Sequence, residues 1–295
     1  MTKKGKAWIE AMRLRTIPVS VAGVVTALGL CMMQGSDIRW MPWVLCMLFA
    51  VLAQIASNFG NEYFDYKDGL DRPGREGPRR GVTEGDLTPQ AMKRATFATL
   101  GVACACGCGL IYWGGWWLIA AGVVIAVAAL AYSAGPYPLS RHGLGEVAVV
   151  LFFGLVPVLL TSWLITGLQP DVTQWCAALG MGLLGANVLV VNNYRDRADD
   201  EAVGKHTLAV RWGSRAMVWL YAVNALAGVG LTLPAWIAMD AWLAVIPVAV
   251  YAGLLVPLCR RMSRESGRSL NRLLGATARA MVLYALTFLV AGLAS

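Results

Sequence analysis

The sequence predicts an all-α membrane protein with nine transmembrane helices. Of its 295 residues, 58% are hydrophobic and only 14% are charged, whereas a soluble domain carries roughly 25% charged residues. The apolar residues form long runs, each about long enough to cross a ~30 Å hydrocarbon core as a helix. In lipid the helix is the stable form of such a run, because it satisfies its own backbone hydrogen bonds. The expected spans are residues 17–34, 41–60, 95–113, 115–134, 145–166, 172–191, 214–233, 241–258 and 276–294.

The basic residues predict how these helices are oriented. Every Lys and Arg except Arg39 lies in the N-terminal segment, in alternate connections or just inside an adjoining span. The positive-inside rule then places the N-terminus in the cytoplasm. We expect a multi-pass protein of the cell inner membrane, with a single domain over residues 1–295 whose helices surround a central cavity. The net charge of +8 is explained by this orientation and by attraction to lipid headgroups, so no nucleic-acid partner is expected.

Acidic residues cluster in two connections on the expected cytoplasmic side, residues 61–94 and 192–213. The start of each connection repeats Asn, Tyr and Asp at the same spacing, as Asn61, Tyr63 and Asp65 and as Asn192, Tyr194 and Asp196. A repeat of this kind predicts two related helical halves that face each other across the cavity. Residues four apart share one face of a helix. Each segment can therefore aim several oxygens at one point. Because both segments lie on the cytoplasmic side, we expect the active site of the protein to face the cytoplasm.

Carboxylates that converge from two segments repel each other and are costly to desolvate at membrane level. Mg²⁺ would remove this cost, because it prefers oxygen ligands and commonly binds one or two carboxylates together with substrate phosphates. Neighbouring basic residues would hold the remaining phosphate charge; these are Arg72, Arg75, Arg79, Arg80, Arg195 and Lys205. Acids for a metal and bases for phosphate, at the mouth of an apolar bundle, predict a site for a lipid diphosphate. The remaining acids of these connections are expected to be solvated, namely Glu76, Glu84, Asp86, Asp199 and Glu201.

These segments resemble the motifs of the UbiA-type intramembrane prenyltransferases, most of all the branch that acts on 1,4-dihydroxy-2-naphthoate. The first motif of that branch is matched by Asn61, Tyr63, Asp65, Gly69 and Asp71. The second is matched by Asn192, Asn193, Arg195, Asp196, Asp200, Gly204, Lys205, Thr207 and Leu208. Residues 15–18, 77–81 and 143–146 are also similar to the family. The chain departs from it at Glu62, where Asp is usual, and Gly69 replaces the last Asp of the hydroxybenzoate branch.

The resemblance implies an enzyme that uses Mg²⁺ and two substrates, polyprenyl diphosphate and 1,4-dihydroxy-2-naphthoate, beside the lipid bilayer. The product would be demethylmenaquinone, formed with loss of carbon dioxide and diphosphate in menaquinone biosynthesis. The implied catalytic residues are Asn61, Asp65, Asp71, Asn193, Asp196 and Asp200, and the metal ligands are Asp65, Asp68, Asp71, Asp196 and Asp200. The implied diphosphate contacts are Arg79, Arg80, Asn192, Arg195 and Lys205, and the pocket for the carbocation and acceptor would hold Tyr63, Tyr132 and Tyr137.

Two other functions fit the sequence less well. A family member with another aromatic acceptor would keep the same motifs and differ only around the acceptor. A transporter would tend to carry ionisable residues near the middle of the membrane, whereas the acids here gather at one side.

Overall fold

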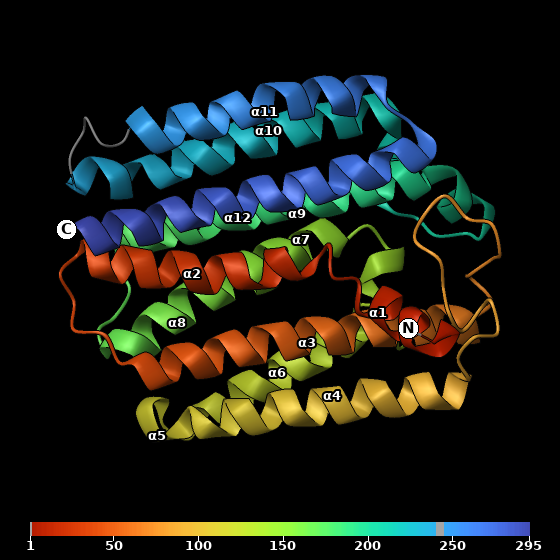
Figure 1. Cartoon of the computed structure of the whole chain (residues 1–295), viewed down its shortest axis with the longest axis horizontal. Helices are drawn as coiled ribbons and strands as arrows, with labels where there is room; N and C mark the ends of the chain where they lie inside the picture. The colour runs from red at the N-terminus through yellow and green to blue at the C-terminus, as the bar shows by residue number, and fades with distance from the viewer. Residues whose placement is uncertain (1, 240–244) are drawn as a thin grey trace.

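The computed structural model describes residues 2–239 and 245–295. Every regular element within those ranges is a helix, which confirms the predicted all-α class. Figure 1 shows the long helices lying side by side in one bundle. The long elements are α2 (Ile17–Met33), α3 (Trp40–Lys67), α4 (Pro89–Gly109), α6 (Trp117–Ala131), α8 (Val156–Thr166), α9 (Val172–Ala202), α10 (Leu208–Met239), α11 (Val245–Arg264) and α12 (Leu270–Ala294). The short ones are α1 (Lys3–Met12), α5 (Ile111–Gly114) and α7 (Gly145–Val149).

The helices of the described ranges make the chain an integral membrane protein. Seven of them, with α4–α5 and α7–α8 each taken as one span, are long and apolar enough to cross a membrane. An eighth would be the pair α1 and α2, which is bent by 46°. Helix α6 has 15 residues and so measures about 22 Å, less than the ~30 Å hydrocarbon core. The count of nine and the orientation stay predictions, and the start of the expected span 241–258 lies outside the described residues.

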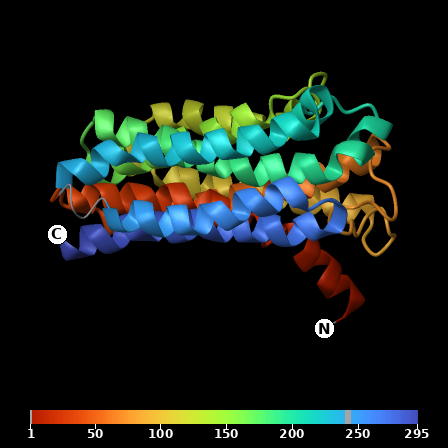
Figure 2. The ribbon, with the colours of Figure 1, turned by 90° about the horizontal axis from the view of Figure 1, so that it is seen from above.

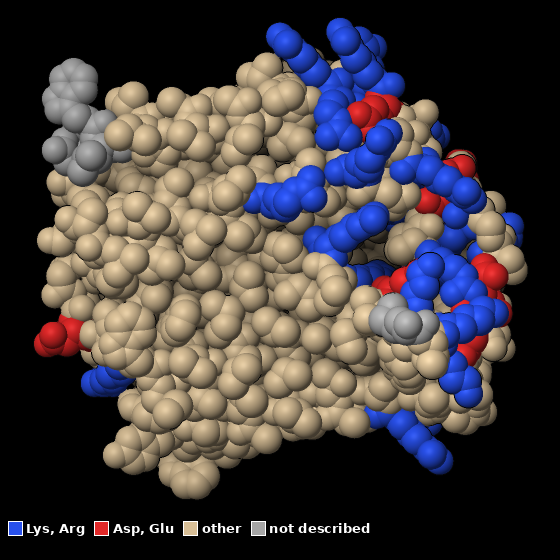
Figure 3. All heavy atoms as spheres, in the orientation of Figure 1, with Lys and Arg blue, Asp and Glu red and all other residues tan. Residues whose placement is uncertain are grey.

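Helices α3 and α9 are both much longer than a membrane crossing requires. Helix α3 has 28 residues and α9 has 31, whereas about 20 suffice. The expected spans end at residues 60 and 191, but both helices continue through the acidic segments. Figure 3 shows Lys, Arg, Asp and Glu gathered at one end of the molecule, around a hollow, while the rest of this face is almost free of charge. The extra turns of α3 and α9 carry their acids into this charged end.

The first long helix, α2, packs against the last one, α12. Figures 1 and 2 show the two helices next to each other. Both use glycine at the contact: a Cβ on Gly29 would overlap the backbone of Phe288, and a Cβ on Gly292 would lie 2.6 Å from the Cβ of Met32. Small residues let membrane helices approach closely, so that backbone and side-chain atoms pack without voids. This contact joins the first long helix of the chain to the last.

A π-helical segment, residues 150–155, separates α7 from α8. Within it, Gly154 lies against Gly182 of α9 so closely that a Cβ on Gly154 would overlap the Gly182 backbone. Pro157 follows in the first turn of α8, and inside a continuous helix its missing N–H removes one backbone hydrogen bond. Such segments often occur at functional sites, and this one turns Phe152 and Phe153 toward the interior cavities.

Candidate active site

One face of α3 is polar from the middle of the bundle to its charged end. Gln54, Asn58, Asn61 and Asp65 follow each other at helical spacing and are all buried. The Gln54 side chain donates to Asn58 Oδ1 at 3.1 Å, and Asn61 Nδ2 donates to Asp65 Oδ2 at 3.3 Å. Asn61 Nδ2 also donates to the hydroxyl of Ser133 at 2.9 Å. This stripe of linked polar groups points the first acidic motif into the bundle.

The second motif occupies the facing end of α9. Asp196 is 2% exposed, and the Arg195 guanidinium donates to both of its carboxylate oxygens at 2.7 Å. Arg195 also donates to Asn192 Oδ1 at 2.8 Å and to Asn271 Oδ1 of α12 at 2.9 Å. Arg195 thus fixes Asp196 relative to both α9 and α12.

Both acidic helices end in the same way. Gly69 and Gly204 adopt φ of 68° and 74°, a left-handed conformation that glycine adopts without strain. The amide after each glycine donates back to a motif aspartate: Leu70 N to Asp65 O at 2.8 Å, and Lys205 N to Asp200 O at 2.9 Å. This hydrogen bond is typical of the Schellman motif. It returns the chain beside an aspartate in both halves, but α9 runs one turn further, so Asp200 takes this place and not Asp196, which repeats Asp65 in the sequence.

Two arginines of the connection after α3 form ion pairs with the motif aspartates. Arg75 Nη1 lies 2.6 Å from Asp71 Oδ1, and Arg75 Nη2 lies 2.8 Å from Asp196 Oδ2. The Arg80 Nε lies 3.4 Å from Asp71 Oδ2. Burial, followed by the charge of Asp65, raises the pKa of Asp71 above its ordinary value, and Arg75 opposes this shift. Burial also opposes the charged form of Arg75, but Asp196 and Asp71 outweigh it and raise the Arg75 pKa.

Lys205 joins the two motifs on their other side. Its Nζ donates to Asp65 Oδ2 at 3.0 Å and lies 3.9 Å from Asp200 Oδ1. Arg75 and Lys205 therefore each link a carboxylate of the first motif to a carboxylate of the second. Because all the partners are buried, these contacts are only weakly screened by solvent.

The acids and bases surround a cavity of about 670 Å³. Eleven of the residues implied by the family resemblance line it, and these are Asn61, Asp65, Arg79, Arg80, Tyr132, Asn192, Asn193, Arg195, Asp196, Asp200 and Lys205. The structure thus brings together residues from α3, α9 and three connections. Their roles in binding and catalysis stay predictions.

Four other implied residues do not line the cavity. Asp71 lies behind it, held by Arg75 and Arg80. Asp68 has a side chain that is 39% exposed and pairs with Arg141 at 2.7 Å. Tyr63 packs edge-on against Phe64. Tyr137 is 56% exposed and stacks on His142.

Sequence reasoning missed several residues of the site. Arg13 lines the cavity and donates to Asn61, but at the sequence level it is one of many basic residues that set the orientation. Glu146 is 6% exposed and accepts from Asn193 Nδ2 at 2.8 Å, so it orients that amide from behind. Gln54 and Asn58 carried a usable signal, because polar residues at helical spacing inside an apolar span indicate a polar interior face.

The donor atoms of the site suit a divalent cation such as Mg²⁺. Asp65 Oδ1 and Asp71 Oδ2 are buried and accept no hydrogen bond. Within residues 2–239 and 245–295, no three acidic, His or Cys side chains stand close enough together to hold a metal ion. Arg75 and Lys205 lie between the carboxylates instead. The oxygen atoms of the carboxylates are the ligands that Mg²⁺ prefers. The positively charged side chains of Arg75 and Lys205 lie where these carboxylates require a positive charge.

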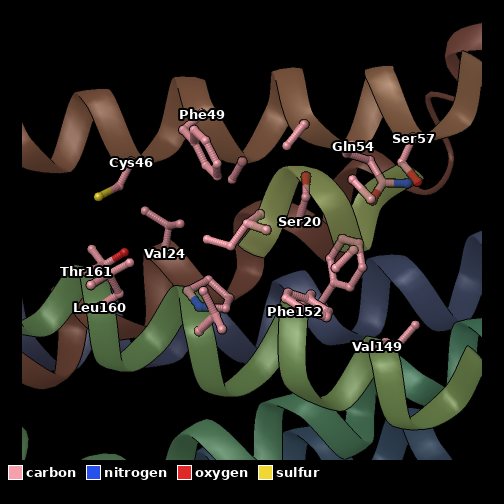
Figure 4. Close-up of a pocket in the computed structure, with 18 of the residues that line it drawn as sticks. Ser20, Val24, Cys46, Phe49, Gln54, Ser57, Val149, Phe152, Leu160 and Thr161 are labelled. Carbon is pink, nitrogen blue, oxygen red and sulfur yellow. The ribbon is translucent and has the colours of Figure 1, made fainter. Parts of the chain in front are cut away.

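A second, apolar cavity of about 120 Å³ lies deeper in the bundle. Figure 4 shows Phe49 of α3, Val24 of α2 and Phe152 of the π-helical segment around it. Gln54 and Tyr132 line both cavities. The polar site therefore adjoins an apolar space that runs between the helices.

Known proteins are similar to this chain over most of its length. The sequence model of the UbiA prenyltransferase family matches residues 22–286. A Mycobacterium tuberculosis protein named 1,4-dihydroxy-2-naphthoate octaprenyltransferase is 35% identical over 285 residues, which cover 95% of this chain and 94% of that protein. The Escherichia coli protein of the same name is 36% identical over 219 residues, 70% of this chain and 69% of that protein.

Solved structures share the fold. A UbiA homolog from Aeropyrum pernix matches with a TM-score of 0.70 at 12% identity over 98% of both chains. A UbiA homolog from Archaeoglobus fulgidus, bound to DMAPP and Mg²⁺, matches with a TM-score of 0.62 at 14% identity over 96% of this chain and 99% of that one. The family match spans most of the sequence and includes both acidic motifs, so the chain belongs to the UbiA prenyltransferase family.

Proposed function

We propose that this protein transfers a polyprenyl group from polyprenyl diphosphate to 1,4-dihydroxy-2-naphthoate in menaquinone biosynthesis. The observation that carries the proposal is the cavity in which the motif carboxylates of α3 and α9 face basic side chains, next to an apolar space. The relatives named as naphthoate octaprenyltransferases support the choice of acceptor. We place the protein in the cell inner membrane with this cavity open to the cytoplasm, because the basic residues gather at the same end.

The first requirement of the reaction is a stabilised leaving group. Asp65, Asp196 and Asp200, supported by Asp71, would hold Mg²⁺, which supplies positive charge for the leaving diphosphate when it is bound. Arg80 and Lys205 line the cavity and are buried, so they can donate hydrogen bonds to phosphate oxygens in a site of low dielectric. The bond between C1 of the prenyl group and oxygen then breaks, and its electron pair leaves with the diphosphate.

The second requirement is protection of the allylic cation. Water that reached the cation would convert it to an alcohol, so the prenyl chain must lie in a dry space. The apolar lining of the cavity beside the polar site suits the first carbons of the chain in chemistry (Figure 4). Tyr132 lies where the two cavities meet, and its ring can stabilise a cation through the negative charge of its face.

The acceptor completes the reaction. The ring carbon that bears the carboxylate forms the new bond to C1, and the carboxylate then leaves this carbon as carbon dioxide, with its bonding electrons returned to the ring. The product is thus the hydroquinone form of demethylmenaquinone. A bicyclic acceptor offers more apolar surface than a single-ring hydroxybenzoate, and each buried Å² contributes roughly 25 cal/mol.

Purified protein in lipid vesicles tests the proposal. Labelled polyprenyl diphosphate is supplied with Mg²⁺ and one of three acceptors, namely 1,4-dihydroxy-2-naphthoate, 4-hydroxybenzoate or homogentisate. We expect prenylated product and carbon dioxide with the naphthoate alone. Transfer to a different acceptor would keep the family chemistry and overturn the assigned substrate.

A further inference from the structure

Gln54 of α3 lies where the polar cavity and the apolar cavity meet. It lines both of them, together with Ser57, Tyr132, Val149 and Phe153. Gln54 is 9% exposed, and Figure 4 shows it beside Ser57, one helical turn along α3. In the proposed reaction the two substrates must meet close to this junction, because one cavity holds the charged groups and the other is apolar.

The amide oxygen of Gln54 has no hydrogen-bond partner. Oε1 is buried, and it accepts no hydrogen bond from residues 2–239 or 245–295. A buried carbonyl oxygen of this kind costs free energy, because it has given up its hydrogen bond to water and gained none in the protein. A ligand that carries an O–H or N–H group would supply the missing hydrogen bond.

The neighbours of Gln54 fix which atom of its amide is the oxygen. Asn58 Nδ2 donates to the backbone carbonyl of Met12 at 2.9 Å. A carbonyl can only accept, so Asn58 Oδ1 is the atom that faces Gln54, and it accepts from Gln54 Nε2 at 3.1 Å. The hydroxyl of Thr16 donates to the Arg13 carbonyl at 2.9 Å. The Thr16 oxygen can therefore only accept from Gln54, whose Nε2 lies 3.5 Å away.

These hydrogen bonds prevent the Gln54 amide from turning over. The reversed amide would place Oε1 against Asn58 Oδ1 and the Thr16 oxygen, which are both acceptors, and would lose the hydrogen bonds of Nε2. Because the network ends on two backbone carbonyls, it holds Oε1 on the side of the amide away from Asn58. Gln54 thus offers an acceptor, and no donor, to a ligand at the junction.

We propose that Gln54 Oε1 accepts a hydrogen bond from a hydroxyl group of the aromatic acceptor and so positions the ring at the junction. The inference rests on the proposed prenyl transfer. The prenyl donor has no O–H or N–H group outside its diphosphate, which the charged end of the site would hold, so the aromatic acceptor is the substrate that can donate. Gln54 lies about 10 Å along α3 from Asn61, a gap that a fused ring system and the first carbon of the donor can span.

The two hydroxyl groups of 1,4-dihydroxy-2-naphthoate are not equivalent. The hydroxyl at position 1 is next to the carboxylate and donates to it within the molecule. The hydroxyl at position 4 has no such neighbour, so its proton is free to bind the protein. We therefore expect Gln54 to bind the hydroxyl at position 4. This hydroxyl is not adjacent to the carbon that forms the new bond, so the contact positions the ring and takes no part in the bond changes.

Analogues that differ only at position 4 test this contact in the wild-type protein. Their affinities are measured in lipid nanodiscs with Mg²⁺ and inorganic diphosphate, by competition with labelled 1,4-dihydroxy-2-naphthoate. The 4-amino analogue keeps a donor and should bind about as tightly as the dihydroxy compound. The 4-methoxy analogue keeps the oxygen without its proton, and 1-hydroxy-2-naphthoate has neither. Both should bind about ten-fold more weakly, as expected for the loss of one neutral hydrogen bond.

The variant Gln54→Met removes the amide and keeps the length of the side chain. We expect it to bind the dihydroxy compound and 1-hydroxy-2-naphthoate with equal affinity, because the amide causes the preference between them. The matched control is Ser57→Ala at the same junction, which should keep the preference whatever its effect on affinity. A preference that persists in the Gln54 variant, or disappears in the Ser57 variant, would overturn the assignment to Gln54.

Two further outcomes separate this contact from the proposed function. Prenyl transfer by a wild-type protein that binds all four compounds equally would assign Oε1 to a bound water and overturn the contact, and the proposed function would stand. This result also decides the matter should the Gln54 variant fail to fold. Binding in the expected order without any prenyl transfer would uphold the contact and overturn the proposed function.

Discussion

Replacing Arg75 by Gln removes the side chain that links Asp71 to Asp196. Its two contacts measure 2.6 and 2.8 Å, and its side chain is only 12% exposed. Removing one partner from a buried ion pair generally costs 3–5 kcal/mol, because the remaining charge stays buried. The low end applies here, since Asp196 keeps two bonds to Arg195 and Asp71 keeps Arg80 at 3.4 Å. We expect a loss of about 3 kcal/mol in the free energy of unfolding, roughly a 150-fold change in the equilibrium constant.

Titration with sodium dodecyl sulfate in mixed micelles measures this loss, with the reactivity of the buried thiols of Cys31 and Cys46 as the signal for unfolding. Mg²⁺ and diphosphate together should restore more stability to the variant than to the wild type, because a bound cation replaces the missing charge. The control is Arg72→Gln, since Arg72 is exposed and donates only to the Ala202 carbonyl. Its loss should stay below about 0.5 kcal/mol. Equal stability of the Arg75 variant and the wild type would refute the bridging role.

Three further predictions address the chemistry and the topology. Asp65→Ala and Asp196→Ala should each lower the rate of prenyl transfer at least ~10²-fold, as loss of an electrostatic contact to the transition state does, whereas Glu84→Ala should lower it little; similar mild effects at all three positions would favour a merely structural role. Activity should disappear in EDTA and return with Mg²⁺ or Mn²⁺, and full activity in chelator would contradict the metal-assisted reaction. A reporter fused after Ser295 should be active only outside the cytoplasm and one inserted near Arg268 only inside it; activity of both on one side would mean that the spans are miscounted.

The membrane helices were predictable because lipid imposes a length and a composition on them. The helix ends were harder to place. Hydropathy falls where the acidic motifs begin, at residues 61 and 192, yet α3 continues to Lys67 and α9 to Ala202. Backbone hydrogen bonding does not depend on side-chain polarity, so a helix continues until a residue such as Gly69 or Gly204 turns the chain.

The ion pairs between the two motifs could not be predicted from the sequence. Arg75 pairs with Asp196, which is 121 residues away in the sequence, and Lys205 pairs with Asp65, which is 140 residues away. Which of several nearby cations reaches which carboxylate depends on how the connections fold over the bundle. The sequence predicted that Arg79 and Arg80 both contact the diphosphate. In the structure Arg80 is buried and lies against Asp71, whereas Arg79 is partly exposed and pairs with Asp86.

The close contact between α2 and α12 has a consequence for biogenesis. A ribosome delivers α2 to the membrane first and α12 last, so the glycine surface of α2 lacks its partner until synthesis is almost complete. During that time Gly29 can be approached by the wrong helix, of this chain or of another. A substitution such as Gly29→Leu should therefore reduce the amount of assembled protein in cells more than its residual activity per molecule, because the contact is the final step of assembly and lies far from the charged end.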